Sequence, residues 1–83
     1  MNVQEDVVDV LEQVLRIGAR SRSLKTDSPL LGSIPELDSM AVVGIVTSLE
    51  ERFGFVIDDD EIDGSTFATL GALVAFVDGK LAK

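Results

Sequence analysis

Hydrophobic residues recur at helical spacing in three parts of this chain of 83 residues. The first part runs from about Val3 to Ala19, and its apolar positions, three and four residues apart, predict a long amphipathic helix. The second part predicts a helix from Ser39 to Arg52. Its apolar stripe consists of Val42, Ile45, Val46, Leu49 and Phe53. The third part predicts a closing helix that begins at about Thr69, so the pattern as a whole predicts an all-α protein.

A long connection, from Arg20 to Leu37, separates the first two predicted helices and is rich in serine, proline and glycine. Connections of this length are unusual in compact domains unless they are pinned or functional. Five apolar side chains are available to pin it across the helices: Leu24, Leu30, Leu31, Ile34 and Leu37. We therefore expect a loop that packs on the helices over much of its length.

An acidic segment, residues 58–64, lies between the second and the closing helix. Asp59, Glu61 and Asp63 fall at the first, third and fifth positions of a calcium-binding loop. The twelfth position of such a loop should supply a bidentate glutamate, but Leu70 stands there. The prediction for this segment is therefore a short acidic helix, and no metal site is expected.

These elements predict a small four-helix bundle with three long helices, one short acidic helix and a long first loop. Eighty-three residues make one domain, so residues 1–83 are expected to form a single unit. With 46% apolar residues the chain can bury one core without disulfides or metal, and we expect a monomer.

Ser39 stands where the second helix is predicted to begin, directly after Asp38. A serine or aspartate at this place is a helix-start signal, because its side-chain oxygen accepts a hydrogen bond from a backbone N–H that has no helical partner. Asp38 and Glu36 also suit the positive end of the helix dipole. By themselves these residues indicate a helix cap, and the rest of the sequence decides whether Ser39 has a further role.

The sequence contains no histidine and no cysteine, which narrows that role. A serine nucleophile needs a base within hydrogen-bond reach, and histidine is the usual base. Asp38 is a sequence neighbour of Ser39, and neighbouring residues on a helix do not face each other. Thiolate chemistry, disulfides and Cys/His zinc sites are excluded as well. We therefore expect no enzyme, whereas a hydroxyl that another protein modifies is compatible with this composition.

The surface is expected to be acidic, because fifteen Asp and Glu residues against seven Lys and Arg residues give a net charge of −8. This charge repels phosphate backbones and disfavours nucleic-acid binding. It attracts partners with basic docking patches, although acidic residues also serve solubility alone. The N-terminal apolar residues alternate with acidic ones, unlike those of a secretory signal, and no apolar run approaches bilayer length. We therefore expect a cytoplasmic protein that does not insert into a membrane.

The order of these elements, with Asp38-Ser39-Met40 opening an amphipathic helix after a Leu/Pro-rich loop, resembles the acyl carrier proteins and their carrier-domain relatives. The Leu-Glu-Glu-Arg-Phe-Gly segment (Leu49–Gly54) at the end of that helix strengthens the match, which covers nearly the whole chain. The resemblance implies a 4'-phosphopantetheine arm, derived from coenzyme A and attached to Ser39, whose thiol carries cargo as a thioester. It also implies two kinds of partner, a phosphopantetheinyl transferase and acyl-activating or acyl-transferring enzymes with basic docking patches.

Five residues are expected to form the surface that these partners recognise. Asp38, Glu50 and Glu51 match the acidic positions that flank the family's docking helix. Met40 and Val43 lie outside the core stripe and close to Ser39 in sequence, so they form an apolar patch beside it.

The subfamily is less sharply defined by the sequence. Housekeeping fatty-acid carriers have acidic residues where Ala41 and Gly44 stand here. The Leu-Asp-Ser-Met motif (Leu37–Met40) is similar to the motif of D-alanyl carrier proteins. The longer segment from Leu30 to Glu51 resembles accessory acyl carriers of bacterial exopolysaccharide or exosortase systems. We expect an accessory acyl carrier that serves fatty-acid, lipid, polyketide or exopolysaccharide-linked biosynthesis. The alternatives are an aminoacyl carrier and a small acidic interaction domain that has only a capped helix.

Overall fold

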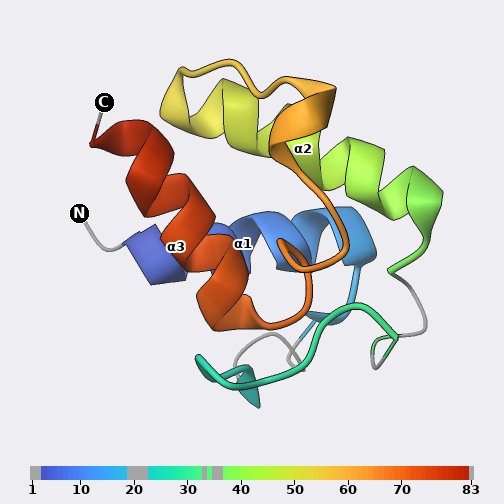
Figure 1. Cartoon of the computed structure of the whole chain (residues 1–83). Helices are drawn as coiled ribbons and strands as arrows, with labels where there is room; N and C mark the ends of the chain where they lie inside the picture. The colour runs from blue at the N-terminus through green and yellow to red at the C-terminus, as the bar shows by residue number, and fades with distance from the viewer. Residues whose placement is uncertain (1–2, 19–22, 33, 35–36, 83) are drawn as a thin grey trace.

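The computed structural model describes residues 3–18, 23–32, 34 and 37–82 of the chain. These residues form three α-helices, α1 (Val3–Leu15), α2 (Ser39–Phe53) and α3 (Leu70–Leu81). In Figure 1, α1 crosses behind α3 and runs below α2, and it contacts both of them. The all-α prediction is confirmed. None of the described helices is both long and apolar enough to cross a membrane.

The short fourth helix predicted for the acidic segment is replaced by a single 3-10 turn, η2 (Asp59–Glu61). The described part of the chain therefore holds three α-helices, and the prediction of a four-helix bundle is wrong. The turn closes on itself: the N–H of Asp58 donates to Glu61 Oε2 at 2.8 Å, and the N–H of Glu61 donates to the Asp58 carbonyl at 3.0 Å. These local bonds satisfy the backbone without a helix.

Asp63 redirects the chain immediately after η2. Its Oδ1 accepts hydrogen bonds from the backbone N–H groups of Ser65 and Thr66, at 2.9 and 3.3 Å. Too few consecutive residues remain between the two turns for an α-helix, whose first turn is costly to form.

Two of the helices, α1 and α2, end where the backbone enters the left-handed region. The predicted end of α2 at Arg52 is correct to within one residue: the helix ends at Phe53, and Gly54 follows it with φ of 74° and its N–H bonded to the carbonyl of Glu50. The end of α1 was predicted wrongly, at Ala19, which lies outside the described residues. Arg16 has φ of 55°, and its N–H donates to the carbonyl of Glu12 at 2.9 Å, so the helix closes four residues earlier, at Leu15.

Aliphatic side chains from all three helices and from the loops make the core. The largest fully buried ones are Val7, Val10, Leu11, Leu30, Ile45, Leu49, Leu70, Leu73 and Val77. Leu30 and Leu37 confirm the prediction that the first loop is pinned by apolar side chains, since both are buried. Leu31 does not pin it, because 46% of this residue is exposed.

The described part of the first loop is hydrogen-bonded to the start of α3. The N–H groups of Leu70 and Gly71 donate to the carbonyls of Ser28 and Thr26, at 3.0 and 2.7 Å. In the opposite direction, the N–H of Leu30 donates to the carbonyl of residue 68 at 3.0 Å. Figure 1 shows this loop below the first turn of α3. Two of the backbone donors that a helix start leaves unpaired are satisfied in this way, and the chain is held on its path toward α2.

An ion-pair cluster joins α2 to α1. The Arg52 guanidinium lies 3.0 Å from a carboxylate oxygen of Asp6 and 3.3 Å from one of Asp9. The Arg52 side chain is 35% exposed, so we assign this cluster a minor share of the stability.

Candidate functional site

Ser39 is the first residue of α2 and is exposed to solvent. Asp38 precedes it in an extended conformation and caps the helix: Asp38 Oδ1 accepts the N–H of Ala41 at 2.8 Å. The helix-cap role of Asp38 predicted from the sequence is therefore confirmed, and this role belongs to Asp38 rather than to Ser39. The Ser39 hydroxyl makes no hydrogen bond to any residue that the structure describes, so it is accessible at the helix start.

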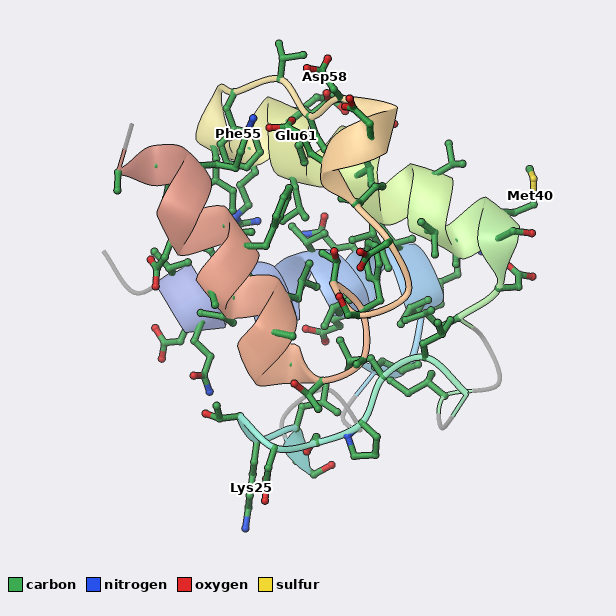
Figure 2. All side chains as sticks on the ribbon, in the orientation of Figure 1. Lys25, Met40, Phe55, Asp58 and Glu61 are labelled. Carbon is green, nitrogen blue, oxygen red and sulfur yellow. The ribbon has the colours of Figure 1, made fainter. Side chains whose placement is uncertain are left out.

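An exposed stripe extends from Ser39 along α2. It consists of Met40, Val43, Thr47 and Glu51, which follow one another at helical spacing on one face of the helix. Met40 is 79% exposed and Val43 is 62% exposed, and Figure 2 shows Met40 projecting from the end of α2 away from the body of the protein. The stripe is thus apolar beside Ser39 and acidic at Glu51, which lies about 18 Å farther along the helix axis than Ser39.

Glu50 lies beside this stripe but points elsewhere. Its Oε2 accepts the backbone N–H of Ile57 at 2.8 Å, and the residue is half-buried. The structure therefore brings together Ser39, Met40 and Val43, places Glu51 on the same face, and engages Glu50 with the loop that follows α2.

Two adjoining grooves lie next to the stripe. The first, of about 250 Å³, is lined by Leu31, Val42, Ile62, Asp63, Gly64 and Phe67. The second, of about 240 Å³, is lined by Val42, Val43, Val46, Thr47, Glu50, Ile57 and Ile62. Val42 and Ile62 line both, and Val42 lies one helical turn from Ser39. A long apolar group attached at Ser39 therefore has apolar side chains within its reach.

Known proteins share this arrangement. Residues 5–77 match the family described as "Phosphopantetheine attachment site". An acyl carrier protein of Exiguobacterium sp. is 33% identical over 81 residues, which cover 98% of this chain and 91% of the relative. The chain belongs to the acyl carrier protein family.

The solved structures give the same result for the fold. The solution NMR structure of a holo acyl carrier protein from Nitrosomonas europaea is 53% identical in sequence to this chain. The match covers 100% of both chains and has a TM-score of 0.93. The carrier is accordingly not an enzyme, and its cofactor is covalently attached phosphopantetheine.

The geometry of the carrier fits that cofactor. Attachment to a side chain requires a hydroxyl that a second protein can reach, and Ser39 is exposed. The Asp38 carboxylate is held by the N–H of Ala41, so the first turn of α2 stays closed next to the hydroxyl. Ser39, Asp38 and Ala41 all belong to the part of the carrier that the structure describes.

The acidic segment of the carrier serves the fold. Lys80 Nζ lies 2.9 Å from both carboxylate oxygens of Glu61. Hydrogen bonds from the side chain and backbone of Ser65 and from the backbone of Thr66 hold the pKa of Asp63 below its ordinary value. Within the described residues, no group of three or more carboxylates is arranged to hold a metal ion.

Several residues of the site were missed by the sequence reasoning. Leu31, Ile62 and Phe67 line a groove although they are far apart in the sequence. Leu31 was predicted only as a pin of the first loop, and Ile62 only as part of the acidic segment. Val42 was correctly placed on the apolar stripe, but the periodicity does not distinguish a buried position from a half-buried one at a groove. The hydrogen bond from the Ile57 N–H to Glu50 could not be predicted from any pattern in the sequence.

Proposed function

We propose that Ser39 is the residue to which phosphopantetheine is attached, and that the carrier presents acyl intermediates to partner enzymes from this site. The observation that supports the proposal is the exposed Ser39 hydroxyl at the start of a helix capped by Asp38. The bound cofactor supplies a terminal thiol, which the polypeptide lacks because it has no cysteine.

The chain's own residues supply position and access. The Asp38 cap fixes the first turn of α2, so that Ser39 has a defined place relative to Met40 and Val43. Without histidine, the protein has no imidazole to act as a base for Ser39, and the transferase is expected to remove the hydroxyl proton.

We further propose an accessory acyl carrier of fatty-acid, lipid, polyketide or exopolysaccharide-linked biosynthesis, with an apolar acyl cargo. The grooves next to Ser39 favour such a cargo over an amino acid, because their shared wall consists of Val42 and Ile62. Burial of each methylene of a cargo chain there contributes about 0.8 kcal/mol, whereas an aminoacyl group has a charged amine that gains nothing from an apolar wall.

Loading the holo carrier with either an octanoyl or a D-alanyl group tests this cargo class. We expect the octanoyl form to melt several degrees higher than the unloaded holo form and to shift the methyl NMR signals of Val42 and Ile62. The D-alanyl form should resemble the unloaded one. Equal shifts and equal melting temperatures for both cargoes would instead indicate that the grooves do not select acyl chains.

Partner enzymes are proposed to dock on the α2 face that contains Ser39. The docking residues are Asp38, Met40, Val43, Glu50 and Glu51, of which Asp38 also caps the helix and Glu50 also binds the loop. The exposed apolar side chains suit a partner with an apolar surface near the attachment site. A basic group of the partner then fits the acidic end of the stripe at Glu51, about 18 Å from Ser39 along the helix axis.

Reversing the charge of Glu51 should slow docking. Exposed charges mainly set encounter rates, so Glu51→Lys is expected to reduce the association rate with a phosphopantetheinyl transferase severalfold at low salt, with the difference shrinking above about 0.5 M salt. The matched control is Asp78→Lys, which makes the same change of charge at an exposed position of α3. Stopped-flow rates that fall equally for both variants would show a response to net charge alone and would contradict a specific role of Glu51.

A further inference from the structure

Leu31 is an exposed leucine in a part of the first loop that backbone hydrogen bonds hold in place. The N–H of Leu31 donates to the Phe67 carbonyl at 2.9 Å, and the N–H of Leu30 donates to the carbonyl of residue 68 at 3.0 Å. Figure 1 shows this part of the loop, coloured teal, next to the chain that leads into α3. The backbone is therefore fixed while 46% of Leu31 stays exposed, so its side chain is available for contact with another molecule.

Leu31 is the most exposed apolar residue of the first groove, which it lines together with Val42, Ile62 and Phe67. The volume of this groove is about 250 Å³. An apolar cavity of about 150 Å³ already takes up a benzene molecule, so the groove has room for one leucine, methionine or phenylalanine side chain. Phe67 is buried and Val42 is half-buried, so an inserted side chain would meet apolar atoms below the rim as well as at Leu31.

The first groove continues the proposed docking face of α2. Val42 lines the groove and is the sequence neighbour of Val43, which is 62% exposed on the stripe. Asp63 also lines the groove and is exposed. Among the described residues, every hydrogen bond that the Asp63 carboxylate accepts goes to Oδ1, so Oδ2 is available to a cation. The groove thus combines an apolar pocket with a negative charge, as the stripe combines Met40 with Glu51.

We propose that the first groove receives an apolar side chain of the phosphopantetheinyl transferase, with Leu31 as its main contact and a basic residue of the transferase beside Asp63. This inference rests on the proposed function, because it extends the α2 docking face across Val42 onto the first loop. The transferase meets the carrier before the cofactor is attached, when neither the arm nor a cargo chain can fill the groove. Its basic residue is the kind of group that a net charge of −8 attracts.

The apolar anchor and the charged contacts should differ in their kinetics. A buried apolar anchor mainly slows dissociation, whereas exposed charges mainly raise the encounter rate and are screened by salt. Removal of the Leu31 side chain should therefore weaken docking to a similar degree at low and at high salt. This response separates Leu31 from Glu51, whose effect on docking should shrink above about 0.5 M salt.

Competition measures docking apart from the transfer step. A Ser39→Ala chain has no acceptor hydroxyl at residue 39, so its inhibition of the loading of a known acyl carrier protein by transferase and coenzyme A reports binding alone. Adding Leu31→Ala should raise the inhibition constant about five- to tenfold, both at low salt and at about 0.5 M salt, as expected for truncation of a buried anchor. Leu31→Met keeps an apolar side chain of similar size and should restore inhibition to within about twofold.

The basic contact is tested by Asp63→Asn, which keeps the Oδ1 acceptor and removes the charge. Inhibition by this variant should weaken severalfold at low salt, and the difference should disappear at about 0.5 M salt. Asp60→Asn removes the same charge from another exposed position and should weaken inhibition clearly less. Equal losses for the two variants would show a response to net charge alone and would remove Asp63 from the docking surface.

Leu81→Ala is the matched control for the anchor, because Leu81 is a leucine of similar exposure, 39%, at the end of α3. It should leave the inhibition constant unchanged, and circular dichroism checks that both leucine variants keep their helices. Equal inhibition constants for the Leu31→Ala and Leu81→Ala chains would overturn the anchor alone. A Ser39→Ala chain that did not inhibit loading at all would overturn the anchor together with the proposed docking face. Intact-mass analysis of the unaltered chain after loading shows separately whether it accepts the cofactor.

Discussion

Ser39→Ala should abolish attachment of phosphopantetheine while leaving the helical fold intact. The substitution removes the proposed acceptor hydroxyl, and no other hydroxyl-bearing residue among those described lies at the start of α2 next to the Asp38 cap. The fold should tolerate it, since the cap bond runs from the N–H of Ala41 to Asp38, and alanine is the most favourable residue within a helix. We expect no mass increase after incubation with transferase and coenzyme A, and a far-ultraviolet circular dichroism spectrum close to that of the unaltered chain.

Ser48→Ala is the matched control for this experiment. Ser48 lies on the same helix, nine residues from Ser39, which places it on the opposite face of α2. This variant should be loaded as completely as the unaltered chain. A Ser39→Ala chain that still gained the full mass increment, or a Ser48→Ala chain that lost it, would contradict the proposed attachment site.

Gly71→Ala should lower the free energy of unfolding by about 1–3 kcal/mol, the range typical of an overpacked site. A Cβ at position 71 would lie 2.6 Å from Thr26 Cγ2 and 2.8 Å from the Thr26 carbonyl oxygen. The N–H of Gly71 also donates to that carbonyl, so the clash cannot be relieved without moving the loop that leads to α2. In a domain of this size each kcal/mol lowers the melting temperature by about 4–8 °C, which thermal circular dichroism measures readily.

Gly79→Ala separates this clash from the effect of helix propensity. Gly79 belongs to the same helix, is exposed, and has no atom within 4 Å of the Cβ position. Alanine is favoured over glycine in a helix by up to about 1 kcal/mol, so this variant should be as stable as the unaltered chain or more so. A Gly71→Ala chain that melted as high as Gly79→Ala would show that the loop yields to α3 without penalty.

Structural features that depend only on residues close together in the sequence, such as the ends of α2, could be predicted. Asp38 and Gly54 bound α2 through contacts made within four residues, and such local signals predicted both ends of this helix. The exposed position of Met40 and Val43 followed from their place outside the apolar stripe. The end of α1 was missed because Arg16 has the left-handed conformation, in which glycine is usual and arginine rare.

Features that depend on distant contacts could not be read. The acidic segment is rich in residues that start helices, and only its contacts show that it forms a 3-10 turn tied to Lys80, 19 residues beyond Glu61. The sequence likewise placed Glu50 and Glu51 together as docking residues. Their side chains differ in environment because Glu50 meets Ile57 after the chain has turned at Gly54. The position of Glu50 at the edge of the second groove could therefore be found only from the folded structure.

The most direct test of the central claim is to map the cofactor on the intact holo chain. The protein would be loaded with transferase and coenzyme A, digested, and fragmented by a mild method that keeps the phosphodiester bond. We predict one phosphopantetheine per chain, with every fragment that carries it containing Ser39 and none of the other serines or threonines modified. A cofactor located on any other residue, or a chain that takes up none under conditions that load a known acyl carrier protein completely, would contradict the account.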